Sequence, residues 1–277
     1  MLYFKGLIHR CDTSERDEVG TPFKRILLSS LTIIVLYPTQ TALLSLNPHS
    51  KAFPVDTNLL LPEDADSKSI GDQWISNRTV DQLPRGFDYA LKISLPRYTT
   101  VIRHNASAFG LDWRLIMAVM KQESEFDENA VSSRGAYGLM QVMPATGLEV
   151  ASRLGLKNLD HPHRNIRGGT FYLAKLYRLF EGAPDEDRLR LAIAAYNAGA
   201  GRIHDAQDVA NYLGENPFSW QVIEKVLPLL SKQHHVLHSS VWDGGKPRNG
   251  YFGKWRQTIL YVQRVIQNYE RYKSMLI

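Results

Sequence analysis

A helical period of apolar residues runs through the C-terminal part of the chain and restricts the folds that it can adopt. From Tyr98 onward, apolar residues recur every three or four positions, the spacing that gathers side chains on one face of an α-helix. Alternation with a period of two, typical of half-buried strands, is almost absent. Clear stripes are formed by Val101, Ile102, Ala106 and Phe109 and by Trp255, Ile259, Val262, Ile266 and Tyr269. The sequence therefore predicts an all-α domain.

Residues that end or cap helices separate these stripes. Gly110 follows the first stripe and suits the position just past a helix end. Asp112 can cap the next helix, whose apolar stripe begins at Trp113. Gly199 ends a later helix, and Pro228 predicts a kink or break in the one that follows.

An uncharged stretch over residues 26–46 directly follows Lys24 and Arg25. Its most apolar part has the length of a signal-peptide core, and the whole stretch just reaches the ~20 residues that span a bilayer. No clean cleavage site follows, so an uncleaved anchor, a cleaved signal and a buried core segment all stay open. The basic residues place the N-terminal end in the cytoplasm and send the remainder across the membrane. We expect residues 1–46 to be a cytoplasmic lead with a signal or anchor, and the rest to lie in the periplasm or cell envelope.

Prolines recur among polar residues between this stretch and the helical domain. They include Pro54, Pro84 and Pro96, and such spacing opposes long helices. The sequence predicts a Pro-rich tether over residues 47–96 and one catalytic domain over residues 97–277.

The charge and cysteine content narrow the classes of partner and cofactor. A net charge of +5 favours anionic partners, among them nucleic acid, membrane surface and acidic cell-wall polymer. The basic residues are scattered rather than set in a stripe with aromatics, so we expect no nucleic-acid partner. Cys11 is the single cysteine, which rules out an internal disulfide. His234 and His238 have helical ligand spacing but no acidic or cysteine partner, and we expect no metal.

Glu123 stands at the end of an apolar helix face that includes Ile116, Val119 and Met120. Partial desolvation of such a carboxyl disfavours its charged form and raises its pKa. A group of this kind can protonate a glycosidic oxygen near neutral pH. Taken alone, the pattern also fits a surface glutamate at a helix end.

Two further runs give this glutamate a chemical context. Residues 130–144 read AVSSRGAYGLMQVMP, in which Gly135 and Gly138 permit tight turns and close approach of a ligand. Gln141 offers an amide suited to sugar hydroxyl or N-acetyl groups, and Met143 offers a soft apolar surface. Residues 195–199, AYNAG, end a later helix.

In these runs the sequence resembles the soluble-lytic-transglycosylase and goose-type lysozyme superfamily. The run ESEF at residues 123–126, the run at 130–144 and AYNAG follow the order and spacing of that superfamily, and the resemblance covers roughly residues 98–272. It implies a lysozyme-like helical domain with a substrate cleft and no cofactor. It identifies Glu123 as the catalytic acid and base. It assigns substrate contacts or the cleft floor to Ser132, Gln141, Met143, Tyr196 and Asn197.

A last superfamily motif, Glu-Thr-x-x-Tyr-Val, is matched by QTILYV at residues 257–262. The resemblance makes Tyr261 the tyrosine whose hydroxyl lies near the acid, although a packing role also fits. Gln257 replaces the usual glutamate, so the resemblance does not carry the ion pair of that glutamate over to this chain.

A finer similarity is to the membrane-bound lytic murein transglycosylase F type. It rests on LDWRLI at residues 111–116, NPFSW at 216–220 and LPLLS at 227–231. That group usually carries a solute-binding-like domain ahead of the catalytic one, and the short stretch before residue 97 leaves us expecting none here.

The resemblance implies cleavage of peptidoglycan glycan strands between N-acetylmuramic acid and N-acetylglucosamine, with a 1,6-anhydro end formed by a single glutamate. A hydrolase of muramidase or chitinase type on the same fold is the first alternative, and would need a second carboxylate roughly 5–9.5 Å from the first. A non-catalytic glycan-binding module is the second.

Overall fold

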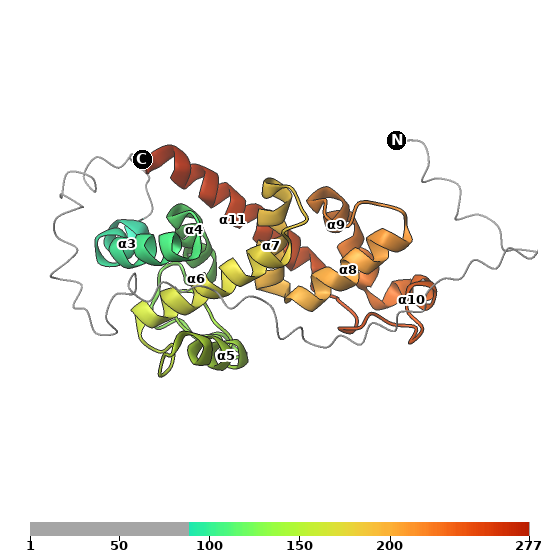
Figure 1. Ribbon diagram of the computed structural model, residues 1–277, viewed down its shortest axis with the longest axis horizontal. Coiled ribbons are helices and arrows are strands. Elements are labelled where there is room, and N and C mark those ends of the chain that lie inside the picture. The colour runs from blue at the N-terminus through green and yellow to red at the C-terminus, as the bar shows by residue number, and fades with distance from the viewer. Residues whose placement is uncertain (1–88, 277) are drawn as a thin grey trace, which may run out of the picture. The chain divides into compact units, whose positions relative to one another are not determined.

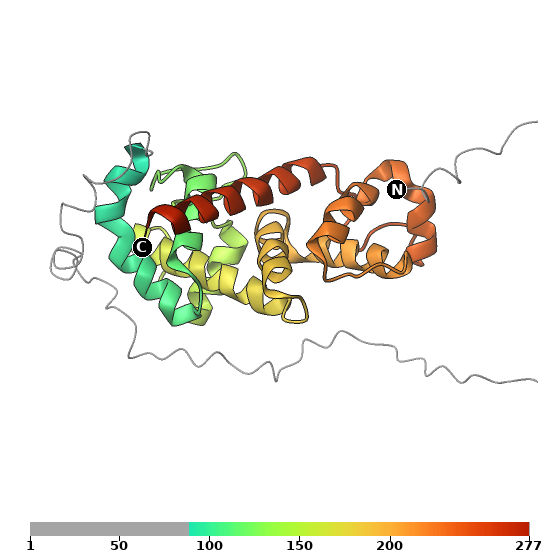
Figure 2. The same ribbon diagram turned by 90° about the horizontal axis from the view of Figure 1, so that it is seen from above.

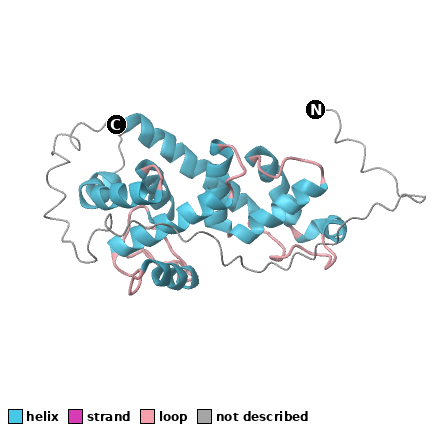
Figure 3. Cartoon of the chain, in the orientation of Figure 1, coloured by secondary structure: helices cyan, strands magenta, loops and turns pink. Residues whose placement is uncertain are grey.

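The computed structural model describes residues 89–276, and these residues form a helical domain without β-strands (Figures 1 and 3). Two isolated backbone bridges, in the loop between α4 and α5, are the nearest approach to sheet pairing in this part of the chain. The all-α class predicted from the helical period is confirmed. The elements are α3 (Tyr89–Phe109), α4 (Trp113–Ser124), α5 (Pro144–Leu154), α6 (Pro162–Leu179), α7 (Asp185–Ala198), α8 (Ala200–Tyr212), α9 (Trp220–Val226), the 3₁₀ turns η2 (Leu227–Leu230) and η3 (Lys232–His234), α10 (His235–Val241) and α11 (Trp255–Met275).

The start of the helical domain differs from the boundary expected at residues 96 and 97. Helix α3 begins at Tyr89 and runs through Pro96, so the last part of the expected tether is helical. A proline inside a helix removes one backbone donor, but it does not prevent the turns on either side from forming. The signal or anchor segment expected at 26–46 and the first part of the expected tether lie outside the described residues. None of the helices within 89–276 is long and apolar enough to cross a membrane.

Helix α4 lies in the core of the domain. Its residues 115–120 are all buried, and Ile116, Val119 and Met120 have no exposed surface. Helix α11 packs along α4 and also contacts α7, while α6 packs between α3 and α7 (Figures 1 and 2). Neighbouring helices therefore pack against α4 from more than one side. This packing fixes the position of its polar C-terminal end.

A second group of helices supports the beginning of α11. Pro228 ends α9 as expected, because the chain passes there into the 3₁₀ turn η2. The Phe252 amide donates to the Leu230 carbonyl, and buried Asp205 accepts two hydrogen bonds from Asn249. These bonds hold the loop that leads into α11.

Of the three histidines at positions 234, 235 and 238, only His238 is buried, and it packs in the core. His238 hydrogen-bonds the Leu229 carbonyl at 2.7 Å and contacts the rings of Trp242 and Tyr251. His234 is partly buried and His235 is exposed. Over residues 89–276, no group of three His, Cys, Asp or Glu side chains is arranged to hold a metal ion.

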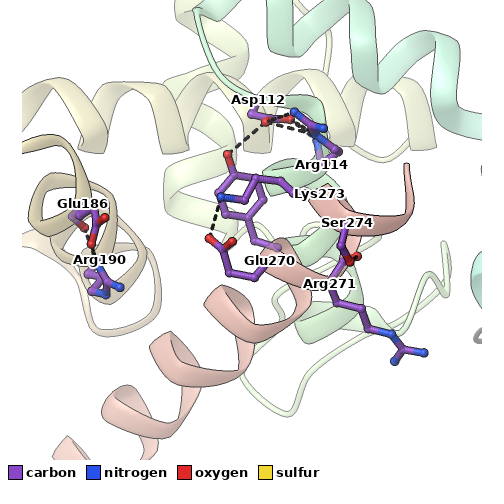
Figure 4. A network of polar contacts seen from close by, with 9 residues as sticks. Asp112, Arg114, Glu186, Arg190, Glu270, Arg271, Lys273 and Ser274 are labelled. Atoms are coloured by element: carbon purple, nitrogen blue, oxygen red, sulfur yellow. Dashed lines mark hydrogen bonds and ion pairs between the residues drawn. The ribbon is translucent and has the colours of Figure 1, made fainter. Parts of the chain in front are cut away.

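The first turn of α4 is fastened by Asp112 (Figure 4). Its carboxylate accepts the Arg114 amide at 2.8 Å, as the sequence predicts for an N-cap, and also pairs with the Arg114 guanidinium. The Tyr269 hydroxyl of α11 donates to the same carboxylate at 3.0 Å. Partial burial opposes the charged form of Asp112, but the hydrogen bonds from Arg114 and Tyr269 outweigh it and lower the pKa.

Replacing Asp112 tests how much this fastening contributes. Asp112→Ala removes the cap, the ion pair and the tyrosine contact, and we expect it to lower the free energy of unfolding by about 2 kcal/mol at pH 7. Asp112→Asn is the matched control, because it keeps the cap and loses the ion pair, so its loss should be smaller. Urea denaturation measures both.

The pH dependence gives a second reading of the same variants. The folded-state pKa of Asp112 is depressed, so its contribution is present at neutral pH and is lost as the pH falls below about 4. The difference between wild type and Asp112→Asn should shrink in acid. Equal stability of wild type and Asp112→Ala at pH 7 would contradict the assignment.

Candidate active site

Glu123 lies in the last turn of α4, directly after the fully buried Met120 face, and its side chain is partly buried. The Tyr261 hydroxyl, from the second turn of α11, donates a hydrogen bond of 2.5 Å to Glu123 Oε1. Tyr261 is itself buried. Two residues 138 positions apart in the chain thus meet because α11 packs along α4.

Burial controls the protonation of this pair. Desolvation raises the pKa of Glu123 to about 7, and the hydrogen bond from Tyr261 partly opposes the rise because it stabilises the carboxylate. Burial and the nearby Glu123 charge raise the pKa of Tyr261 and of Tyr196 well above the usual value. Both phenols stay protonated at neutral pH, and the glutamate can exchange a proton there.

The chain leaves α4 through a strained turn next to the glutamate. Glu125 and Phe126 both have positive φ, at 52° and 68°, in a region that side-chain-bearing residues seldom adopt. The Glu125 amide closes the helix by donating to the Lys121 carbonyl. This turn directs the chain into the loop of residues 130–143.

Two of the predicted binding residues shape this loop with their side chains. Ser132 Oγ accepts the Ala136 amide at 2.9 Å. The Gln141 side-chain amide donates to the carbonyls of Ala130 and Gly138 at 2.8 and 2.9 Å. The Ser132 hydroxyl hydrogen and the Gln141 side-chain carbonyl oxygen take no part in these bonds. Both groups therefore remain available to a ligand.

Three helices hold the backbone at the centre of the loop. Ser124 of α4 donates to the Leu139 carbonyl at 2.9 Å, and Tyr196 of α7 donates to the Met140 carbonyl at 2.8 Å. Asn165 of α6, with 1% of its surface exposed, accepts the Met140 amide at 2.8 Å and donates to the carbonyl of Tyr137 at 3.0 Å. Sequence reasoning missed Asn165, although a polar residue on the apolar face of a helix was the available signal.

The end of α7 contributes the exposed carboxamide of Asn197. Its Oδ1 accepts a hydrogen bond of 2.8 Å from Thr258 Oγ1, which is buried in the first turn of α11. Thr258 lies within the tyrosine motif, but sequence reasoning assigned it no role. Tyr196, one residue earlier than Asn197, donates to the Met140 carbonyl of the loop.

Met143 is set apart from this group. It precedes the first residue of α5, is 42% exposed, and lines a cavity of about 420 Å³ together with Pro144, Leu148 and Leu159. Glu123 is not among the lining residues of that cavity. The structure therefore brings Glu123, Tyr261 and Tyr196 together, attaches the loop with Ser132 and Gln141 to them, and puts Met143 at the far end of that loop.

Comparison with known proteins identifies the family to which the matched residues belong. Residues 100–218 match the family model described as the transglycosylase SLT domain. The chain carries a transglycosylase SLT domain. The match includes Glu123, the loop of residues 130–143 and the AYNAG run, and it extends to the residues before α9.

Curated relatives are named membrane-bound lytic murein transglycosylase F, the group that the sequence motifs resemble. The membrane-bound lytic murein transglycosylase F of Desulfosudis oleivorans is 34% identical over 189 residues, covering 68% of this chain and 39% of the relative. The protein of the same name from Cellvibrio japonicus is 33% identical over 199 residues, covering 70% and 37%. The chain thus spans less than half the length of these relatives.

Solved structures give weaker matches to the SLT domain. The 70 kDa soluble lytic transglycosylase of Escherichia coli aligns with a TM-score of 0.46 and 22% identity, over 67% of this chain and 26% of its own. An inactive mutant of lytic transglycosylase Slt from Pseudomonas aeruginosa aligns with a TM-score of 0.42 and 28% identity, over 68% and 27%.

Gly138 offers a direct test of how tightly the loop is built. Its φ is +78°, and an added Cβ would lie 2.7 Å from Asn165 Nδ2, a side chain fixed by its own hydrogen bonds. We expect Gly138→Ala to lower the free energy of unfolding by roughly 3 kcal/mol, from the sum of backbone strain and overpacking.

Gly214→Ala is the matched control. Gly214 has φ +73°, is exposed, and would place its Cβ in open space, so it carries the backbone strain alone. We expect a loss of about 1 kcal/mol for this variant in the same urea denaturation experiment. Equal losses for the two variants would show that Asn165 yields to the added methyl group.

Proposed function

We propose that this chain is a lytic transglycosylase of peptidoglycan, with Glu123 as its sole acid and base. The reaction is cleavage of the β-1,4 bond between N-acetylmuramic acid and N-acetylglucosamine, with formation of a 1,6-anhydromuramic acid end. The observation that carries the proposal is the partly buried Glu123 carboxyl, whose pKa of about 7 is combined with a hydrogen bond from Tyr261. The names of the relatives support the substrate class.

The first step requires an acid. With a pKa of about 7, a large fraction of Glu123 is protonated at neutral pH, whereas an ordinary glutamate is almost fully ionised. Tyr261 occupies Oε1 as a donor, so Oε2 carries the transferable proton. Its transfer to the glycosidic oxygen allows N-acetylglucosamine to leave.

The second step requires a base, and the same carboxyl supplies it. Once Glu123 has lost its proton, the Tyr261 hydroxyl stabilises the new charge in a partly desolvated site. The carboxylate then removes the proton of the C6 hydroxyl of N-acetylmuramic acid, and that oxygen closes the anhydro ring at C1. Glu123 returns to its protonated form, and water is not consumed.

Glu125 and Glu128, which follow Glu123 closely in the sequence, bond other residues, and this favours the single-glutamate route over a two-carboxylate hydrolase. Glu125 is exposed and pairs with Lys121. Glu128 accepts the Tyr98 hydroxyl and pairs with Arg97 at 3.0 Å. The pKa of Glu123 is set by burial and by Tyr261.

We assign substrate contacts to the groups that surround this pair. The loop offers the Gln141 carbonyl oxygen and the Ser132 hydroxyl hydrogen, and Met143 offers apolar surface further along. Tyr196 fixes the loop, and Asn197 presents its carboxamide. The proposed location is the periplasm or cell envelope, where peptidoglycan lies, with residues 26–46 serving as a signal or inner-membrane anchor.

Replacing the acid tests the reaction. Glu123→Gln should reduce the release of anhydromuropeptides from purified sacculi by at least about 100-fold, because general acid and base catalysis are both lost. Binding of the variant to sacculi should persist. Glu125→Gln, which changes the exposed carboxylate two residues later, is the matched control and should cleave as wild type does.

Mass spectrometry of the products reads out this experiment. Anhydro ends from wild type support a transglycosylase, whereas reducing ends would identify a hydrolase. Substantial cleavage by Glu123→Gln would remove Glu123 from the reaction altogether.

The pH profile tests the role of Tyr261. Cleavage requires protonated Glu123, so kcat/KM should fall as the pH rises through about 7. Tyr261→Phe removes the donor that stabilises the carboxylate, so the pKa of Glu123 should rise and the falling limb should move to higher pH, with a lower maximal rate. Tyr269→Phe loses a similar bond to Asp112 and should leave the limb in place. If the fall in kcat/KM occurs at the same pH in Tyr261→Phe as in wild type, Tyr261 has only a packing role.

A further inference from the structure

Thr258 makes a polar contact that packing alone does not require. Its side chain is 1% exposed, in the first turn of α11, and its hydroxyl donates to Oδ1 of the exposed Asn197 at 2.8 Å. A buried hydroxyl must have a partner, and this one takes the carbonyl end of a carboxamide that otherwise faces outward.

This bond decides which end of the carboxamide is available to a ligand. A carboxamide has an acceptor end and a donor end, and a half rotation exchanges them. Because Thr258 occupies Oδ1, the two N–H groups of Asn197 are left for the exposed side. Asn197 is thereby set as a donor, which matches acceptor oxygens such as amide carbonyls and carboxylates.

The residue that bonds Asn197 lies one helix turn from the tyrosine that binds the proposed acid. Thr258 and Tyr261 are three residues apart in α11 and share one face, so the helix turn that orients Asn197 also places the hydroxyl bound to Glu123. Tyr196 precedes Asn197, and the charge of Glu123 contributes to its raised pKa. The end of α7 is therefore tied to α11 one turn before the residue that binds Glu123.

We propose that Thr258 is a positioning residue that holds the Asn197 carboxamide with its N–H groups toward the substrate, where they bind a carbonyl-type acceptor oxygen of the glycan. This inference rests on the proposed function for the nature of the ligand. It does not rest on that function for the orientation of Asn197, which can be measured without substrate.

Three substitutions distinguish the orienting role of Thr258 from the ligand-binding role of Asn197. Thr258→Val keeps the shape and removes the hydroxyl, and Thr258→Ser restores the hydroxyl. Asn197→Asp keeps an acceptor for Thr258, so the contact between α7 and α11 survives, but it replaces the outward donors by a second acceptor. A purely structural role would make Asn197→Asp behave as wild type.

Steady-state kinetics on soluble, uncrosslinked glycan strands give the first readout. We expect Thr258→Val to raise KM about five-fold with little change in kcat, the effect of one lost neutral hydrogen bond. Thr258→Ser should lie near wild type, and Asn197→Asp should raise KM at least as much as Thr258→Val. The double variant that combines Thr258→Val with Asn197→Asp should be no worse than Asn197→Asp alone, since Thr258 acts through Asn197. Wild-type KM in Asn197→Asp, or additive losses in the double variant, would overturn the proposal.

Side-chain amide signals of the ¹⁵N-labelled full chain give a readout that needs no substrate. The Asn197 pair should shift in Thr258→Val and return in Thr258→Ser, while thermal unfolding stays close to wild type. If wild type fails to cleave glycan strands but these signals behave as expected, the proposed function fails and the positioning of Asn197 stands. If wild type cleaves glycan strands but the Asn197 signals do not shift in Thr258→Val, the proposed role of Thr258 is wrong and the proposed function stands.

Discussion

The packing of α11 along α4 is the contact on which the rest of the domain depends. Two tyrosines of α11 fasten the two ends of α4, since Tyr269 donates to Asp112 at the cap and Tyr261 donates to Glu123 in the last turn. Between these points, α4 is buried from Leu115 to Met120. A helix fixed at both ends and buried between them cannot rotate, so the direction of the Glu123 carboxyl is set by the core.

Burying the Glu123 carboxyl lowers the stability of the folded state and raises the pKa of the group. Burial raises the pKa of Glu123 from 4.5 to about 7, so the folded state binds this proton more tightly than the unfolded chain does. The domain therefore loses stability as the pH rises between these two values, and the full penalty remains above them. The network at Asp112 has the opposite sign, because its lowered pKa favours the folded state at neutral pH. Helix α4 therefore carries a destabilising buried carboxyl at its C-terminal end and a stabilising contact at its N-terminal end.

The sequence predicts the parts of this arrangement that follow from local periodicity and is silent on those that depend on distant pairing. The stripe through Ile116 and the cap at Asp112 are local features, and both are confirmed. The roles of Asn165 and Thr258 depend on contacts 25 and 61 residues away, which no local pattern encodes. The helix start at Tyr89 is missed because a proline inside the first helix favours a boundary in the wrong place.

Ser132 and Gln141 show a different limit of sequence reasoning. A family motif identifies residues that lie in one loop, but it does not distinguish side chains available to a ligand from side chains that shape the loop. Here both side chains bond the loop backbone, with Asn165 and Tyr196 fixing its centre from two helices. Such a loop loses little conformational entropy when a ligand binds, because its backbone is already ordered. The polar residues buried around it are therefore best understood as a means of ordering the loop in advance, which the apolar core alone could not do.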